Sequence, residues 1–181
     1  MTQRVVVRGG RVVDGSGLPG YTAEQCRQRR RTELHRAADT RRVLVTTCGA
    51  FSERWYNIAE SLGYEVDRLD AGWGKAVDPD DLADHLARHH RAHYDAVTIT
   101  HNETSTGITN DVAALAAVVR EEAPDALVLV DAVSSLGGIP VELDRWGVDV
   151  CMASVQKCIA LPPGITVVAA SDAALARAKK H

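Results

Sequence analysis

The sequence predicts an α/β fold in which a mainly parallel sheet is flanked by helices. From about residue 43 onward, short apolar runs rich in Val, Ile and Leu alternate with longer amphipathic segments, which is the pattern of a parallel sheet covered by helices. The apolar runs are bounded by polar residues or glycine, as buried strands usually are. The 181 residues are enough for one domain with a substantial core and are short for two.

Six strands are expected, one in each of the apolar runs. Each run is rich in Val, Ile or Leu and is too short for a typical buried helix, which favours a strand. The expected strands cover residues 43–47, 64–69, 96–100, 126–130, 148–152 and 166–169.

Three helices are expected between these strands. The first covers about residues 53–62 and ends at Gly63, which suits a C-cap. The second begins with Asp78 as N-cap and Pro79 at the first helical position, because Pro lacks the N–H that a first turn leaves unpaired. The third covers about residues 111–122 and stops before a proline.

The first 42 residues differ in composition from the rest of the chain. Residues 5–17 alternate like a hairpin, whereas residues 25–42 are crowded with Arg and show little apolar periodicity. We therefore expect an atypical extension at residues 1–42 and a separate domain at residues 43–181. Residues 5–23 resemble the opening strands of amidohydrolases of the D-aminoacylase kind but carry no metal ligand, so a fused remnant and a chance likeness both stay open.

The composition favours small-molecule partners in a reducing compartment. The net charge is −3, which gives no electrostatic attraction to nucleic acid or to anionic lipid. The four cysteines show no C-x-x-C spacing, which argues against zinc and against a secreted disulfide scaffold. No apolar run approaches the length of a membrane span, and the N-terminus lacks the apolar stretch of a signal peptide. A cytoplasmic location without nucleic-acid or membrane partners is expected.

Three polar segments, each following an expected strand, carry the candidate chemistry. They are HNETSTG at residues 101–107, VDAVSSLGG at 130–138 and SVQK at 154–157. Because ligands gather at the carboxyl ends of parallel strands, these segments are expected to meet in one crevice. An Asp and a Lys placed in this way suit pyridoxal 5'-phosphate (PLP) chemistry. Asp131 would hold a proton on the pyridine nitrogen, and Lys157, activated by burial, would form the Schiff base and then move the substrate proton.

Residues 43–179 resemble the large domain of class V aminotransferases, which are fold-type I PLP enzymes. Four segments carry the resemblance together: ETSTG, VDAVSSLGG, WGVDV and QKCIALPPG. The likeness is strongest to the alanine–glyoxylate and serine–pyruvate type. The Gln before the lysine also distinguishes the chain from cysteine desulfurases. Those enzymes share the fold, but a His-Lys pair is typical of them at this position.

The resemblance implies a cofactor site and assigns a role to each of its residues. Thr104 is similar to a hydroxyl residue that contacts the cofactor, and Gln156 to a side chain near its phosphate. Phe51 takes the place of the aromatic side chain that stacks on the ring, and Val133 that of the residue against its opposite face. The expected site residues are Lys157, Asp131, Thr104, Gln156, Phe51 and Val133.

Two departures from the family pattern leave the function open between two alternatives. The phosphate-binding turn expected just before Val43 is not found in the Arg-rich segment, and the small domain with its substrate-binding arginine does not follow before His181. The first alternative is a homodimeric enzyme that transfers an amino group between alanine or serine and glyoxylate or pyruvate. The second is a truncated or chimaeric fragment that does not retain the cofactor. An amidohydrolase function is a third, weaker interpretation.

Several of these residues also fit other interpretations. His85 and His89 lie one helical turn apart, as metal ligands can, but no third ligand follows and nearby arginines would repel a cation, so no metal site is expected. Asp131 could instead cap a helix, and Thr104 could belong to an ordinary turn. Phe51 could be a core residue. The pair of serines after Val133 lacks the G-x-S-x-G pattern of serine hydrolases.

Overall fold

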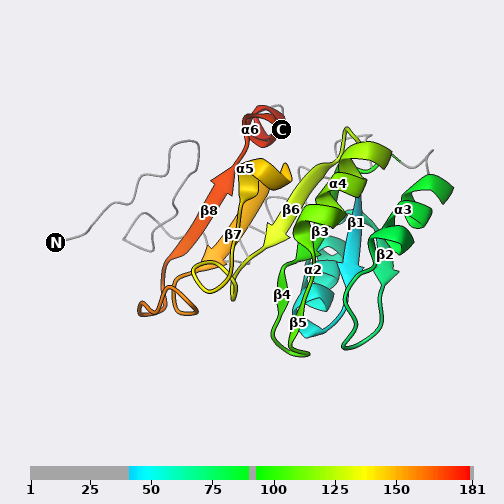
Figure 1. Ribbon diagram of the computed structural model, residues 1–181. Coiled ribbons are helices and arrows are strands. Elements are labelled where there is room, and N and C mark those ends of the chain that lie inside the picture. Colours follow the sequence, from blue (N-terminus) through cyan, green and yellow to red (C-terminus); the bar gives the residue numbers. More distant parts are fainter. Residues whose placement is uncertain (1–40, 90–92, 180–181) are drawn as a thin grey trace.

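A computed structural model describes residues 41–89 and 93–179, which form a six-stranded sheet flanked by helices (Figure 1). The hairpin and the amidohydrolase-like segment expected before residue 24 lie outside the described residues, so the expected extension at residues 1–42 stays a prediction. The strand order is β2-β1-β3-β6-β7-β8. The strands are β1 (Arg42–Thr47), β2 (Glu65–Asp70), β3 (Ala96–Thr100), β6 (Leu127–Asp131), β7 (Val150–Ser154) and β8 (Thr166–Ala170).

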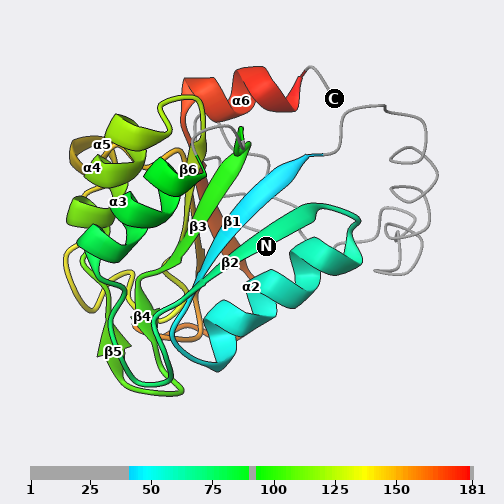
Figure 2. The same ribbon diagram turned by 90° about the vertical axis from the view of Figure 1, so that its right-hand side faces the viewer.

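Helices cover both faces of the sheet. Figure 2 shows α3, α4 and α5 on one side of the sheet and α2 on the other. A separate two-stranded hairpin, made of β4 and β5, follows β3. These elements are α2 (Ala50–Ser61), α3 (Pro79–Arg88), α4 (Val112–Glu122), α5 (Leu143–Trp146), α6 (Asp172–Ala178), β4 (Asn102–Glu103) and β5 (Ile108–Thr109).

Two apolar clusters fill the space between the sheet and its helices. The larger cluster joins α3 and α4 to the sheet and includes fully buried leucines such as Leu82 and Leu115. The smaller cluster lies under α2 and is built on Val43, Val45 and Ala96. Burial of such side chains is the main favourable term in folding, so α2 is held to the sheet along its apolar face.

The structure confirms the α/β fold class, and most of the expected elements occur within one or two residues of the predicted ends. The prediction for α3 is confirmed in detail: the Asp78 side chain accepts a hydrogen bond from the N–H of Asp80 at 2.9 Å, and Pro79 opens the helix. Strand β7 begins two residues later than expected, because the Asp149 carboxylate accepts the N–H of Val128 before the strand pairing begins.

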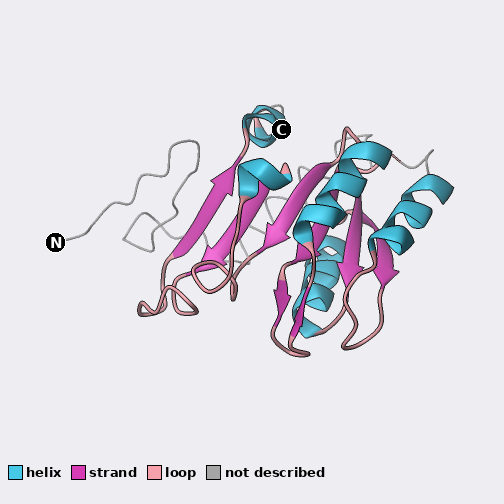
Figure 3. Ribbon diagram, viewed as in Figure 1, coloured by secondary structure: helices cyan, strands magenta, loops and turns pink. Residues whose placement is uncertain are grey.

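Three features differ from the prediction. Helix α2 begins at Ala50 rather than near Glu53, for a reason that lies in the site described below. Strand β8 runs antiparallel to β7, as Figure 3 shows. The connection at residues 155–165 is short and holds no helix, whereas parallel crossovers need a dozen or more residues and usually contain a helix. The hairpin β4–β5 and the helices α5 and α6 were not predicted, because they are short.

Candidate cofactor site

A cavity of about 480 Å³ lies at the carboxyl edge of the sheet, where the loops after β3, β6 and β7 meet the start of α2. Its volume falls within the range of roughly 300–1,000 Å³ typical of small-molecule sites. All six residues that the sequence analysis assigned to the cofactor line it: Lys157, Asp131, Thr104, Gln156, Phe51 and Val133. The structure thus brings together the whole expected set, and the role of each residue stays a prediction.

Asp131 is the last residue of β6 and is held by two hydrogen bonds. Its Oδ1 accepts the backbone N–H of Val133 at 2.9 Å, and its Oδ2 accepts the indole N–H of Trp55 at 3.0 Å. In the sheet it pairs with Thr100 of β3 and Met152 of β7. The carboxylate therefore has a fixed position near the middle of the sheet edge.

Lys157 lies in a tight turn directly after β7. The turn is closed by hydrogen bonds from the N–H of Ala160 to the carbonyl of Lys157 at 2.9 Å and from the N–H of Leu161 to that of Val155 at 3.0 Å. Ala160 adopts a left-handed conformation with φ of 57°, which is uncommon for a residue other than glycine. Lys157 and Gln156 are both exposed. The described residues alone therefore do not supply the burial that the sequence analysis expected to activate the lysine.

The turn that carries Lys157 packs closely against the loop after β6. A Cβ placed on Gly138 would lie 2.5 Å from the Sγ of Cys158 and 3.2 Å from its Cβ, so a larger residue would displace the Cys158 side chain. The thiol of Cys158 also donates a hydrogen bond to the carbonyl of Ser134 at 3.2 Å. The second glycine of the SSLGG segment thus has a steric purpose next to the lysine.

Ser134 links this loop to the loop after β3 as well. Its hydroxyl donates to the carbonyl of Asn102 at 3.0 Å and accepts from the Asn102 side-chain amide at 3.0 Å. Together with the contact from Cys158, these bonds join the three polar segments into one connected edge.

Glu103 is a functional residue that the sequence analysis missed. Its side chain is fully buried, and its carboxylate accepts the N–H of Phe51 at 3.0 Å and that of Ser52 at 2.8 Å, which are two of the unpaired donors at the start of α2. It also accepts the hydroxyl of Ser105 at 2.6 Å. Burial alone would raise the pKa of this carboxyl, but hydrogen bonds from Ser105, Ser52 and Phe51 outweigh burial and lower the pKa from its ordinary value.

The bonds made by Glu103 explain why α2 begins three residues earlier than expected. They also require a glycine next to the helix, because a Cβ on Gly49 would lie 2.5 Å from the Cγ of Glu103 and 2.6 Å from the Oγ of Ser105. Glu103 is the residue before Thr104, so one carboxylate fixes both Phe51 and the segment that presents Thr104 to the cavity. No local pattern in the sequence pointed to this contact.

Phe51 and Trp55 lie one turn apart on α2, so both side chains face the cavity. Phe51 is 36% exposed, which leaves its ring free to contact a ligand. The guanidinium of Arg54 lies 5.5 Å from the centre of this ring. Trp55 was not among the expected site residues, although the helical spacing from Phe51 was a signal that could have found it.

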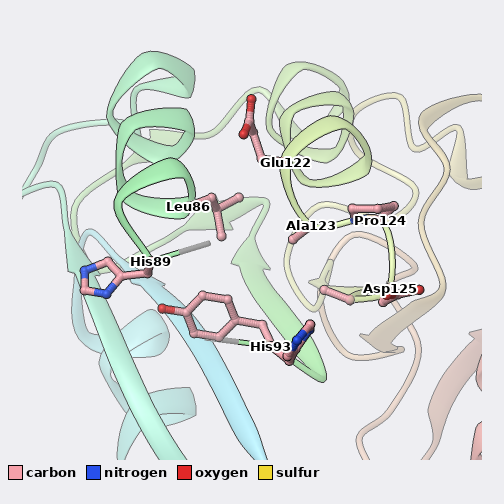
Figure 4. A pocket seen from close by; sticks show the side chains of 9 residues that line it. Leu86, His89, His93, Glu122, Ala123, Pro124 and Asp125 are labelled. Atoms are coloured by element: carbon pink, nitrogen blue, oxygen red, sulfur yellow. The ribbon is translucent and has the colours of Figure 1, made fainter. Parts of the chain in front are cut away.

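A second cavity, of about 170 Å³, lies at the opposite edge of the sheet, where β3 and β6 begin. Figure 4 shows His89 and Asp125 on opposite sides of it, with Glu122 and His93 between them at its other edges. No group of three or more His, Cys, Asp or Glu residues in the described ranges is arranged to hold a metal ion. His90, the fourth histidine of this stretch, lies outside the described residues.

The histidines of α3 contact one another and a tyrosine rather than converging on one point. The rings of His85 and His89 lie 4.6 Å apart, and the Nε2 of His85 is 3.3 Å from the Tyr94 hydroxyl. Tyr94 donates in turn to Asp67 at 2.6 Å. Burial, followed by the charge on His89, lowers the pKa of His85 from its ordinary value.

Within the described residues, no helix is both long enough and apolar enough to cross a membrane.

The fold is that of a class V aminotransferase domain, and the chain belongs to this family. The sequence model of the family "Aminotransferase class-V" matches residues 30–181. The solved structures that it resembles have the fold-type I architecture, with a mainly parallel sheet between helices. The expected family and fold are confirmed.

Three proteins illustrate the similarity. The serine–glyoxylate aminotransferase of Hyphomicrobium methylovorum is 39% identical over 134 residues, which cover 74% of this chain and 33% of the relative. The small subunit of a soluble hydrogenase of a Synechococcus strain is 40% identical over 133 residues, covering 74% of this chain and 34% of the relative. The crystal structure of an alanine–glyoxylate aminotransferase from Nostoc sp. matches with a TM-score of 0.73 at 29% identity, covering 84% of this chain and 39% of that one. The chain thus spans about a third of the length of the curated relatives that it matches.

Proposed function

We propose that this chain forms the PLP-binding core of an aminotransferase that moves an amino group between alanine or serine and glyoxylate or pyruvate. The observation that carries the proposal is that Asp131 and Lys157, at the ends of the neighbouring strands β6 and β7, line the same cavity as Phe51 and Thr104. The substrates are those that relatives act on by name, such as the serine–glyoxylate aminotransferases. Because the chain matches only part of these relatives, the whole activity is a proposal.

The residues that line the cavity fit PLP in size and in chemistry. A cavity of about 480 Å³ accommodates a substituted pyridine ring, and its lining combines one carboxylate with one primary amine. Phe51 and Val133 supply apolar surfaces for the two faces of such a ring. The hydroxyl of Thr104 and the amide of Gln156 are polar groups that suit its ring substituents and its phosphate.

Asp131 and Lys157 are proposed to perform the chemistry. PLP, when bound, supplies an electron sink for the carbanion that forms at the substrate α-carbon. Asp131 keeps a proton on the pyridine nitrogen, because a nearby carboxylate stabilises the positive ring. The Lys157 amine would hold the cofactor covalently and, when free, would act as the base that takes the proton from the substrate α-carbon.

The proposal is tested by adding PLP to the purified full chain and recording its visible absorbance. We expect an absorbance band of lysine-bound PLP that Lys157→Ala abolishes and that sodium borohydride fixes to the residue 157 peptide. Lys179→Ala is the matched control, because Lys179 is an exposed lysine that follows α6, away from the cavity, and this variant should keep the band. A chain that stays colourless in excess PLP would contradict the proposal.

A second candidate function is a chain with the same fold that does not retain PLP. The exposure of Lys157 and Gln156 favours it, because a site open to water gives the lysine and the phosphate partner little desolvation. The absorbance experiment separates the two candidates directly. The homodimer and the cytoplasmic location expected from the sequence stay predictions, and sedimentation of the purified chain tests the first of them.

A further inference from the structure

Trp55 makes a polar contact with the carboxylate that we assign to the pyridine nitrogen. Its indole N–H lies 3.0 Å from the Oδ2 of Asp131, a residue 76 positions further along the chain. The other carboxylate oxygen accepts the N–H of Val133 at 2.9 Å. Within the part of the chain that the structure describes, each oxygen of Asp131 thus has one donor and keeps lone pairs for a ligand in the cavity.

The indole of Trp55 is held firmly, so that its N–H has little freedom to turn away. The side chain is partly buried and packs against the apolar cluster of Val43, Val45 and Ala96. It is carried by α2, and Glu103 anchors the first turn of that helix. A group placed on a packed helix keeps its geometry better than one placed on a loop.

We propose that Trp55 is a positioning residue for Asp131: its indole N–H sets the orientation of the carboxylate so that the free lone pairs point at the pyridine nitrogen of bound PLP. This inference rests on the proposed function for the role of Asp131, whereas the contact itself exists without the cofactor. Hydrogen bonds to charged groups are the stronger kind, so removal of this donor is expected to weaken PLP binding roughly tenfold.

The contact is tested first without cofactor, in nitrogen-15 correlation spectra of the indole N–H groups. The chain has three tryptophans, and Trp55→Phe identifies the Trp55 signal. We expect this signal to lie downfield and to move upfield in Asp131→Ala, because the acceptor is lost. The signal of Trp73, which is 69% exposed, is the internal reference and should stay in place. A Trp55 signal that does not respond to Asp131→Ala would overturn the inference.

The effect on the cofactor is tested by titrating PLP into Trp55→Phe and following the absorbance. Phe keeps the aromatic packing and lacks the N–H, and Trp73→Phe is the matched control, since it makes the same substitution at a 69% exposed tryptophan that is not part of the cavity lining. We expect the dissociation constant of PLP to rise roughly tenfold in Trp55→Phe and to recover in part in Trp55→His, which restores a ring N–H. Urea unfolding of each variant checks that the fold is intact.

Two outcomes separate this inference from the proposed function. Equal PLP affinities of Trp55→Phe and of the unaltered chain, both folded, would overturn the positioning role and leave the function in place. A chain that binds no PLP at all would overturn the proposed function and with it the cofactor role of Trp55, while the indole spectra would still decide whether Trp55 fixes the Asp131 carboxylate.

Discussion

The carboxylate of Glu103 accepts the backbone N–H of Phe51 at 3.0 Å, although 52 residues separate the two in the chain. The bond ties the start of α2 to the hairpin β4–β5 that follows β3. Both sides of the cavity lined by Phe51 and Thr104 therefore depend on one buried acid. Its energetic importance can be measured without any cofactor.

Replacement of the buried acid should destabilise the chain. In Glu103→Gln the neutral amide brings its own N–H donors toward the N–H groups of Phe51 and Ser52, so we expect the free energy of unfolding to fall by roughly 2 kcal/mol. Urea denaturation measures this change. Glu121→Gln, at an exposed position of α4, should change stability by no more than about 0.5 kcal/mol. Equal effects of the two variants would contradict the capping role of Glu103.

A methyl group at Gly49 should interfere with the same acid. We expect Gly49→Ala to cost about 1–3 kcal/mol of stability, because its Cβ would overlap the Glu103 side chain. The cost should shrink in the background of Glu103→Ala, where two of the three overlapping atoms are gone and only the Oγ of Ser105 remains. This double-mutant cycle is read from urea unfolding, and strictly additive effects would show that the clash lies elsewhere.

The close approach of Gly138 to Cys158 predicts an effect on the lysine turn. We expect Gly138→Ala to push the turn outward and to weaken PLP binding by roughly tenfold or more, since small displacements of binding groups are costly. Cys158→Ala removes the nearest atom, so the double variant should recover part of the affinity. The titration of PLP absorbance measures both, and no recovery in the double variant would argue against this steric explanation.

Stability should decline as the pH falls below about 6.5, the ordinary pKa of a histidine. Burial lowers the pKa of His101, and burial together with His89 lowers that of His85. The unfolded chain then takes up protons that the folded chain does not, so stability is lost with falling pH until the folded pKa is reached. Each histidine contributes at most about 1.4 kcal/mol per pH unit. Urea unfolding across this range should give a shallower slope for His101→Phe, and an unchanged slope would contradict the assignment.

Features that depend on neighbouring residues were predictable from the sequence, and features that depend on distant ones were not. The N-cap at Asp78 and the apolar runs of β1 and β3 are local signals, and the structure has them where they were expected. The family motifs likewise led to the six residues that share the cavity.

The reversed strand and the long-range contacts carried no local signal. The direction of β8 depends on the absence of a helix in the connection before it, which periodicity in the strand does not report. Glu103 and Trp55 act on residues 51 to 76 positions away, and their side chains look like an ordinary surface acid and an ordinary core aromatic until the fold brings the partners together.

Ser134 gives the cavity edge a mechanical property. Its hydroxyl forms hydrogen bonds with Asn102, and its carbonyl accepts a hydrogen bond from the thiol of Cys158. If the loop after β3, β6 or β7 moves alone, the hydrogen bonds of Ser134 are stretched. These bonds therefore oppose the movement of one loop without the others. A displacement of the loop that carries Asn102 is therefore expected to reach the turn that carries Lys157 through the hydrogen bonds of Ser134.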